Sequence, residues 1–288
     1  MNAVYKRELG AYFHSMIGYI CIAFLVACVG IYFMAVNLFS GYPSFAYALK
    51  NSLFIFMLTT PLLTMRSMAE DRKNKTDQLL LTSPLSVGKM VMGKYAAMMT
   101  VLVIPCLLFC FCPLIIKLNG NATLATDYAS ILAFFLLGSV CVAVGLLISS
   151  LTESQIIAAI GTFGVLLLGM LWDGLISYLP DSAVFSFMGL VVLTLLLAVL
   201  LNAMTGNWIL SAGVAAVGVV IELIVFLVKK SAYEDLLGNV LGTFSVTTPF
   251  ENFAVDQVFD VAGLILYLSL DALFLFITVQ LVQRRRYS

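Results

Sequence analysis

Long apolar runs separated by short polar breaks make up most of the chain. Each run approaches the ~20 residues that a helix needs to cross the hydrocarbon core of a bilayer. The runs cover approximately residues 15–36, 48–66, 91–116, 128–150, 154–174, 184–203, 208–228 and 260–283. We therefore predict an all-α polytopic membrane protein, with about eight transmembrane helices in a single membrane domain over residues 1–288.

The start of the chain has a different pattern. Apolar side chains at Tyr5, Leu9 and Tyr12 share helical spacing, and the charged residues 6–8 lie among them. This pattern is typical of a helix that lies in the plane of the membrane interface. We predict an interfacial elbow helix over residues 1–14.

Residues 66–94 form a long polar interruption between two apolar runs. Arg66 and Glu70 are four residues apart, as are Asp71 and Lys75, so each pair can meet on one helical face. An apolar patch follows on the same predicted helix, and turn residues end it. The patch is Leu79, Leu80 and Leu81, and the turn is Thr82, Ser83 and Pro84.

This interruption has two interpretations. A solvated loop whose cations hold the membrane topology is the simpler one. Three consecutive leucines beside a charged helix favour the other, because a docking helix needs an apolar face for a partner groove and charges that fix its register. We interpret residues 67–90 as a cytoplasmic coupling loop that contacts a cytoplasmic protein.

The composition further narrows the class of protein and the kinds of functional site that it can contain. Hydrophobic residues are 62% and charged residues 10% of the 288, and the formal net charge is zero. The apolar share is far above that of a soluble domain, and a balanced charge gives no global field to attract nucleic acid. The six cysteines form no CxxC pair and the single histidine allows no HExxH motif, so we expect no metal site and no catalytic residues.

The distribution of cations predicts the orientation. With the N-terminus in the cytoplasm, most of the 15 lysines and arginines fall on the cytoplasmic side, a positive-inside bias. They are Lys6, Arg7, Arg66, Arg72, Lys73, Lys75, Lys89, Lys94, Arg284, Arg285 and Arg286. This orientation places both termini and the hairpin at residues 150–155 in the cytoplasm. The acidic connection 229–259 then lies outside, with a short amphipathic helix expected around residues 236–244.

Residues 88–94 match the GxxxxGK pattern of a phosphate-binding loop. That motif requires Ser or Thr as the next residue and a buried strand before it. Tyr95 follows here, and a polar loop precedes the match. We interpret the match as chance and expect the chain to bind no ATP.

Three carboxylates fall within or near the predicted spans, at Asp173, Glu222 and Asp271. A charge in hydrocarbon costs at least about 2.5 kcal/mol, so each marks a functional site, a water-filled cavity or a pairing between helices. For Glu222 and Asp271, a contact between neighbouring helices and a substrate or proton role both stay open.

Three groups of residues follow one another along the chain. The first group is Met68, Ala69, Glu70, Asp71, Arg72, Thr76, Leu79, Leu80, Leu81, Thr82, Ser83 and Pro84, followed by Gly93 and Lys94. The second group is Leu147, Ser150, Leu151 and Thr152, followed by Ala158. The third group is Pro249, Phe250, Glu251, Asn252 and Phe253, followed by Asp260 and Tyr267. In this order they resemble the permease subunit of bacterial ABC transporters of the ABC-2 type, in particular the gliding-motility-associated branch. The chain departs from that family at Lys75, where glycine is usual, and at Asp71, where glutamate is usual.

The resemblance implies a mechanism and a set of partners. A separate cytoplasmic ATPase subunit, which holds ATP and Mg, would clasp the coupling loop, with the elbow helix nearby. The coupling residues would be Met68, Glu70, Asp71, Arg72, Lys75, Thr76, Leu79, Leu80, Leu81 and Pro84, next to Thr152, Glu153 and Ser154 of the second cytoplasmic loop. The chain would bind no cofactor itself and would work in the bacterial inner membrane beside a second permease protomer, identical or related. An auxiliary membrane or extracytoplasmic subunit is a further candidate partner.

Plain members of that family have six spans, so the resemblance implies a six-helix core with an extra pair between the fifth span and the last. A secondary transporter and a membrane-embedded lipid-modifying enzyme are the two alternative functions. A secondary transporter would need discontinuous helices in two related halves, and the sequence shows no such repeat. A membrane-embedded lipid-modifying enzyme would need polar residues clustered within the spans. We expect an exporter subunit that is not an enzyme by itself.

Overall fold

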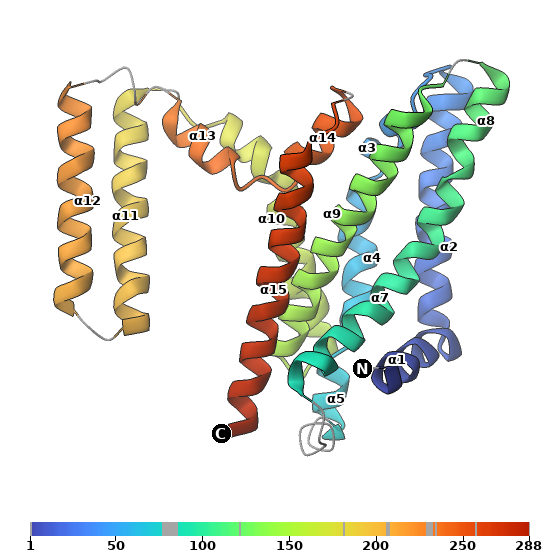
Figure 1. Cartoon of the computed structure of the whole chain (residues 1–288), viewed down its shortest axis with the longest axis horizontal. Coiled ribbons are helices and arrows are strands. Elements are labelled where there is room, and N and C mark those ends of the chain that lie inside the picture. The colour runs from blue at the N-terminus through green and yellow to red at the C-terminus, as the bar shows by residue number, and fades with distance from the viewer. Residues whose placement is uncertain are drawn as a thin grey trace. The chain divides into compact units, whose positions relative to one another are not determined.

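The computed structural model describes residues 2–76, 86–120, 122–180, 182–205, 208–228, 233, 235–256 and 258–287. Within this part of the chain every regular element is a helix (Figure 1). The helices are α1 (Asn2–His14), α2 (Met16–Tyr32), the π-helix η1 (Phe33–Phe39), α3 (Ala46–Asn51), α4 (Phe54–Thr64), α5 (Ala69–Lys73), α7 (Val87–Phe109), α8 (Phe111–Asn119), α9 (Leu124–Leu151), α10 (Gln155–Ser177), α11 (Ala183–Thr205), α12 (Trp208–Val228), α13 (Leu236–Gly242), α14 (Thr248–Ala254) and α15 (Val261–Tyr287). The predicted all-α class is confirmed.

Among the described residues, 5 helical stretches are long and apolar enough to cross a membrane. They are Met16–Phe39, Val87–Asn119, Leu124–Leu151, Gln155–Ser177 and Val261–Arg284. Shorter apolar stretches lie in α11 and α12, at Ala183–Leu196 and Ala212–Leu223. The chain is therefore a multi-pass membrane protein, and the finer expectation of eight spans stays a prediction.

The predicted second span, residues 48–66, is not one continuous helix. The amides of Ser52 and Leu53 bond to carbonyls three residues back, on Leu49 and Lys50, at 3.0 and 3.2 Å. Bonds of this spacing tighten the backbone and separate α3 from α4. The chain turns again after α4, so α5 is a separate helix. The predicted second span and the charged helix that follows it are therefore not one continuous helix.

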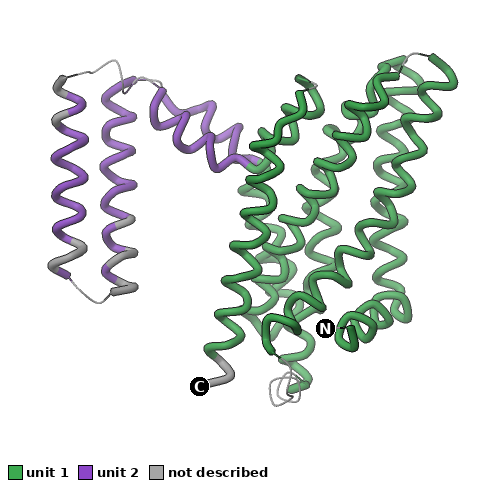
Figure 2. The backbone as a smooth tube through the Cα atoms, in the orientation of Figure 1, with its two compact units in different colours: residues 1–170, 246–288 green, residues 171–245 purple. Residues whose placement is uncertain are grey.

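The chain divides into two compact units (Figure 2). Unit 1 contains Met1–Met170 and Val246–Ser288, and unit 2 contains Leu171–Ser245. In unit 2, α11 and α12 pack side by side through stacked Phe187 and Phe226 rings, with centroids 4.7 Å apart. The short helix expected in the connection after α12 is present as α13.

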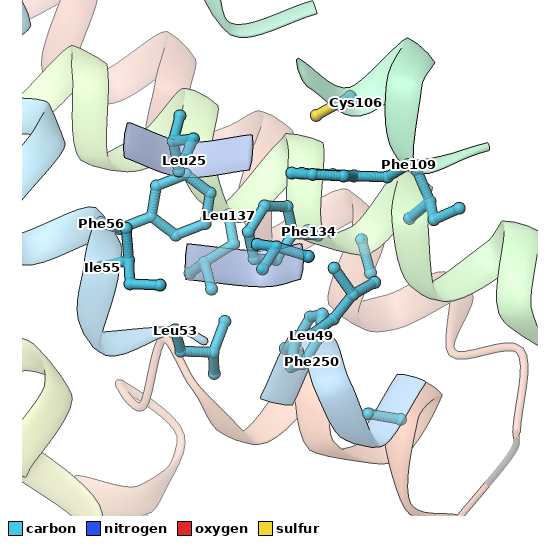
Figure 3. Packing of buried hydrophobic residues seen from close by; sticks show 14 of the residues in the cluster. Leu25, Leu49, Leu53, Ile55, Phe56, Cys106, Phe109, Phe134, Leu137 and Phe250 are labelled. Atoms are coloured by element: carbon cyan, nitrogen blue, oxygen red, sulfur yellow. The ribbon is translucent and has the colours of Figure 1, made fainter. Parts of the chain in front are cut away.

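The described residues of unit 1 form two hydrophobic clusters, and the larger one is rich in aromatic rings. Its centre contains Phe45, Phe56, Phe109, Phe134 and Phe250, which come from α3, α4, α7, α9 and α14 or directly flank them. Figure 3 shows the rings of Phe56 and Phe134 next to each other; they are tilted by 38°, and their centroids are 4.4 Å apart. This aromatic cluster holds α3 and α14 against the long helices.

The second cluster lies at the end of unit 1 that carries α1 and α5, where both chain termini also lie (Figure 1). We call it the α5-end cluster. Its buried members are Tyr12, Cys21, Leu63, Met68, Val87, Met90, Val91, Ala97, Met98, Val101, Val142, Ala143, Leu146, Leu275 and Val282. It therefore joins α1, α2, the end of α4, the start of α5, α7, α9 and α15 in one packed body.

Candidate functional site

The candidate site is the charged segment of residues 66–76, which contains α5 and lies against the end of α9. The hydroxyl oxygen of Ser149 accepts hydrogen bonds from the backbone amides of Met68 and Ala69, at 3.2 and 3.1 Å. Amides at the start of a helix have no partner within the helix, so a buried serine that accepts from them fixes this end of α5. We call residues 66–76 the coupling segment.

The second predicted cytoplasmic loop meets the coupling segment. Arg72 of α5 forms an ion pair with Glu153 at 2.7 Å and donates to the carbonyl of Ser150 at 3.4 Å. The hydroxyl of Thr152 accepts from the amide of Ser154 at 3.1 Å, which fixes the turn that presents Glu153. The two loops that the sequence analysis assigned to the site therefore lie together.

One of the two predicted charge pairs within the coupling segment is present. Arg66 donates two hydrogen bonds to the Glu70 carboxylate, at 2.6 and 3.0 Å. These bonds favour the charged guanidinium and raise the pKa of Arg66. The segment is therefore stabilised locally at the point where the chain leaves the end of α4.

The other predicted pair, between Asp71 and Lys75, is wrong. Asp71 lies 2.6 Å from Lys94 and accepts a hydrogen bond from the hydroxyl of Thr76 at 3.0 Å. Lys75 adopts φ 56°, the left-handed region, which cannot continue a right-handed helix. The expected helix through Leu81 is therefore interrupted, and α5 ends at Lys73. Glycine adopts such a backbone without strain, whereas lysine does not.

Lys94 is the residue that the sequence analysis missed. Its side chain is 1% exposed, and its ammonium donates to Glu8 at 3.0 Å, to Asp71 at 2.6 Å and to the carbonyl of Ser67 at 2.5 Å. A buried lysine needs such partners to remain charged. Lys94 therefore ties α7 to both α1 and the coupling segment. The signal that could have revealed it is a lone cation within an apolar run, which we attributed to a chance motif.

A cleft of about 310 Å³ opens between α1 and the coupling segment. Its charged lining is balanced, with three cations and three anions: Arg7, Arg66 and Lys94 against Glu8, Glu70 and Asp71. Tyr12 also lines the cleft, and its hydroxyl donates to the carbonyl of Leu63 at 2.9 Å. Among the described residues no three His, Cys, Asp or Glu side chains group as metal ligands. The arrangement is suited to polar contact with a partner.

The remaining predicted site residues are distributed as follows. Leu79, Leu80, Leu81 and Pro84 lie outside the described residues. In unit 2, Asp173 accepts a hydrogen bond from Ser245 at 2.7 Å, and Glu222 lies within α12. In unit 1, Asp271 of α15 accepts from Ser139 of α9 at 2.5 Å. The three carboxylates therefore have different surroundings.

Comparison with known protein families decides the class of this protein. The sequence profile of the ABC-2 family transporter proteins matches residues 34–279. The chain belongs to the ABC-2 transporter family. The match includes the coupling segment, the loop at residues 152–154 and Lys94, whereas α1 lies before it. A search of the curated proteins finds no match.

Membership of the ABC-2 family confirms the general resemblance stated from the sequence. The family consists of transporter proteins, and its permeases are transport components of the membrane that work with an ATPase subunit. Several apolar helices long enough to span a bilayer agree with that class. The coupling segment of this ABC-2 protein is therefore the surface on which a functional proposal can be built.

Proposed function

We propose that this ABC-2 protein is the permease subunit of an ATP-driven exporter. It forms the translocation path and couples to a separate ATPase subunit through the coupling segment. ATP and Mg bind to that partner, and this chain binds neither. The complex belongs in the inner membrane of a bacterium, with both termini of this chain in the cytoplasm. The gliding-motility-associated branch is the part of the family to which we assign it.

The anchoring of the coupling segment is the observation that supports the proposal most strongly. A docking element that transmits force must be fixed to the spans and must also present side chains to its partner. Ser149 and Lys94 fix this segment from α9 and α7. Lys73 and Lys75 of the same segment remain exposed. The segment therefore combines a rigid attachment with a free charged surface.

The distribution of charge supports the orientation. The end of unit 1 that carries α5 also carries the charged part of α1, the start of α7 and the last turns of α15 (Figure 1). The predicted cytoplasmic cations lie in these elements or next to α5. Loops rich in Lys and Arg face the cytoplasm in most membrane proteins. This end is therefore the one that reaches a cytoplasmic ATPase.

Exporters of this class need a second membrane half, so we propose a second permease protomer, identical or related, as a partner. An auxiliary membrane or extracytoplasmic subunit remains a further candidate. Membership of the ABC-2 family favours the exporter over a secondary transporter and over a lipid-modifying enzyme. No nucleic acid is expected as a partner.

Purification of the tagged chain from its own cells tests this proposal. We expect an ATPase subunit to co-purify, and the reconstituted complex to hydrolyse ATP faster than the ATPase subunit alone. Reversing the charge of Lys73 and Lys75 together, as Lys73→Glu with Lys75→Glu, should weaken the association and remove the stimulation. Lys117→Glu is the matched control, because Lys117 is an exposed cation of α8 at the other end of unit 1.

Two results would contradict the proposed function. One is a wild-type chain that brings down no nucleotide-binding subunit and instead transports in an ion gradient. The other is ATP turnover that is unchanged in the reversed pair, or reduced equally by the Lys117→Glu control.

A further inference from the structure

The cleft between α1 and the coupling segment contains an unsatisfied buried hydroxyl group. Ser67 lines this cleft and is 3% exposed, and its hydroxyl oxygen has no hydrogen-bond partner among the described residues. A buried polar group without a partner costs free energy, so nearly all such groups in native proteins bond to protein, water or a ligand. The hydroxyl of Ser67 therefore marks the cleft as a place where a ligand with a hydrogen-bonding atom is stabilised.

The charged groups of the cleft keep part of their hydrogen-bonding capacity. Arg66 donates through Nε and Nη2 to the two carboxylate oxygens of Glu70. A guanidinium has five N–H donors and a carboxylate accepts about four hydrogen bonds, so this pair retains both donors and acceptors. The two side chains are 35% and 31% exposed and both line the cleft. The pair can therefore bind a negative and a positive group of the same ligand.

The balance of charge selects the class of ligand. Because three cations and three anions line the cleft, it exerts no net attraction on a nucleotide or on a metal cation. A zwitterion gains from both signs at once, and hydrogen bonds between charged groups are about twice as strong as those between neutral ones. A primary ammonium donates N–H groups to a carboxylate, whereas a quaternary amine has none to donate. The cleft therefore fits a phosphate group joined to a primary amine.

An apolar groove of about 450 Å³ continues from the cleft into the spans. On α2, Ile17 lines the cleft, and Ile20 and Phe24 line the groove. These two residues are three and seven positions after Ile17, so all three lie on one face of the helix. On the other side, Arg66 lines the cleft, and Leu62 of α4, four residues earlier, lines the groove. A molecule with a polar end in the cleft can therefore extend into the groove.

The groove has the chemistry of a site for a hydrocarbon chain. Leu58 of α4 and Ile160 of α10 are exposed along it. Thr59 also lines it, but its hydroxyl is satisfied because it donates to the carbonyl of Ile55 at 3.0 Å. Two of the lining helices, α2 and α10, are long and apolar enough to cross a membrane. The groove therefore opens where the acyl chains of a bilayer lie.

We propose that the cleft and the groove together bind one phospholipid with a primary-amine headgroup, of the phosphatidylethanolamine class. The phosphate meets Arg66 and Ser67, the ammonium meets Glu70, and one acyl chain lies in the groove along Ile20 and Leu62. The helix α1 lies across the end of α2 (Figure 1), where a spanning helix meets the headgroup region of a bilayer. This inference rests on the membrane class of the chain and is independent of the proposed coupling to an ATPase subunit.

Native mass spectrometry of the full chain in detergent, after co-purified lipid has been removed, measures the affinity for each probe lipid. The probes are palmitoyl-oleoyl phosphatidylethanolamine, the phosphatidylcholine analogue, which lacks ammonium N–H groups, and the phosphatidylglycerol analogue, which has a net negative charge. We expect phosphatidylethanolamine to bind about tenfold more tightly than the other two, because each of them loses a hydrogen bond between charged groups. Soluble glycerophosphoethanolamine and inorganic phosphate should not compete at the same concentration, because neither fills the groove.

Two variants test the two halves of the site. Ser67→Ala should weaken the binding of phosphatidylethanolamine about tenfold. The unfolding temperature of the lipid-free chain should stay the same or rise, because this hydroxyl has no partner to lose among the described residues. Ala159→Leu fills the groove from α10 and should weaken the binding of all three lipids at least about fivefold.

The matched controls remove a hydroxyl and add the same side chain elsewhere. Ser269→Ala changes an exposed residue of α15, and Ala216→Leu changes an exposed residue of α12. Both controls should bind phosphatidylethanolamine as the wild type does.

Each other outcome overturns the proposal. Equal affinities for the three lipids would indicate unspecific contact with bilayer lipid, and competition by glycerophosphoethanolamine or phosphate would indicate a soluble ligand. Unchanged affinity in Ser67→Ala or in Ala159→Leu would show that the lipid does not occupy the cleft or the groove. A Ser67→Ala chain that is less stable without lipid would assign the hydroxyl to the fold. None of these results bears on the association with an ATPase subunit, which co-purification tests separately.

Discussion

α4 approaches α9 closely at Gly145, and this contact offers a direct test of how the coupling segment is placed. A Cβ atom on Gly145 would lie 2.3 Å from the hydroxyl oxygen of Thr64 and 2.8 Å from its Cβ and Cγ2 atoms. Thr64 is fully buried and is the last residue of α4, two positions before the coupling segment. Carbon atoms normally pack about 3.5–4.0 Å apart, so Gly145→Ala must push α4 away from α9.

The size of the effect follows from two opposing contributions. Overpacking a close-packed interior costs about 1–3 kcal/mol. The cost here is expected near the top of that range, because the clash involves every heavy atom of the short Thr64 side chain and no flexible end that could move aside. Alanine gains up to about 1 kcal/mol over glycine in a helix. We expect Gly145→Ala to lower the free energy of unfolding by about 2 kcal/mol, or the unfolding temperature by roughly 4–8 °C. ATP turnover in the complex should also fall, because Ser149 no longer meets Met68 and Ala69.

Thermal unfolding of the chain in nanodiscs and ATP turnover of the complex measure the two effects. Gly164→Ala in α10 is the matched control, because a Cβ there meets nothing within 4 Å. Adding Thr64→Ala to Gly145→Ala removes two of the three close contacts and should restore part of the stability. Equal unfolding temperatures for Gly145→Ala and Gly164→Ala would refute the close packing of α4 on α9.

Three further predictions concern the coupling segment and the start of α15. Lys75→Gly removes the strain of a lysine in the left-handed region and should raise the free energy of unfolding by about 1 kcal/mol, whereas Lys75→Ala should not. Equal unfolding temperatures for the two variants would argue against strain at this position. Arg72→Glu and Glu153→Arg should each reduce ATP turnover, and the double variant that exchanges the two charges should recover part of it. The coupling energy between the two positions should be small, about 0.2–1 kcal/mol, because Glu153 is 68% exposed. Strictly additive losses would exclude a direct contact. A hydrogen bond from the Gly263 amide, and to a smaller extent one from the Asn252 side chain, holds the pKa of Asp260 below its ordinary value. Because the folded pKa lies below the unfolded one, this stabilisation is present above the unfolded pKa and is lost as the pH falls through the folded pKa. The unfolding temperature of wild type should therefore drop more on acidification than that of Asp260→Asn, and identical pH profiles would contradict this.

Hydropathy predicted the apolar helices well, because run length and composition are local properties of the sequence. It did not predict the break between α3 and α4, since no Gly or Pro stands at Ser52 and Leu53. The break contains hydrogen bonds to carbonyls three residues back. Phe45 and Phe56, on either side of it, are buried against rings from helices that are distant in the sequence.

The candidate site shows the same division between local and distant contacts. Arg66 and Glu70 are one turn apart, and their pairing was predicted from spacing. Asp71 also had a local candidate, Lys75, but it pairs with Lys94, which lies outside the segment and is fully buried. An ion pair is stronger where water is excluded, so the distant partner prevails over the exposed one. The contact between Lys94 and Glu8 joins residues 86 positions apart, a separation at which spacing carries no information.

A photo-crosslinking residue placed at Lys73 tests the central claim most directly, because Lys73 is exposed at the end of α5. In intact cells we predict a crosslink from this position to a nucleotide-binding ATPase subunit, and none from the same residue placed at Lys117. A chain that crosslinks to no ATPase subunit from Lys73, or equally from both positions, would contradict the assignment of residues 66–76 as the surface that receives force from ATP hydrolysis.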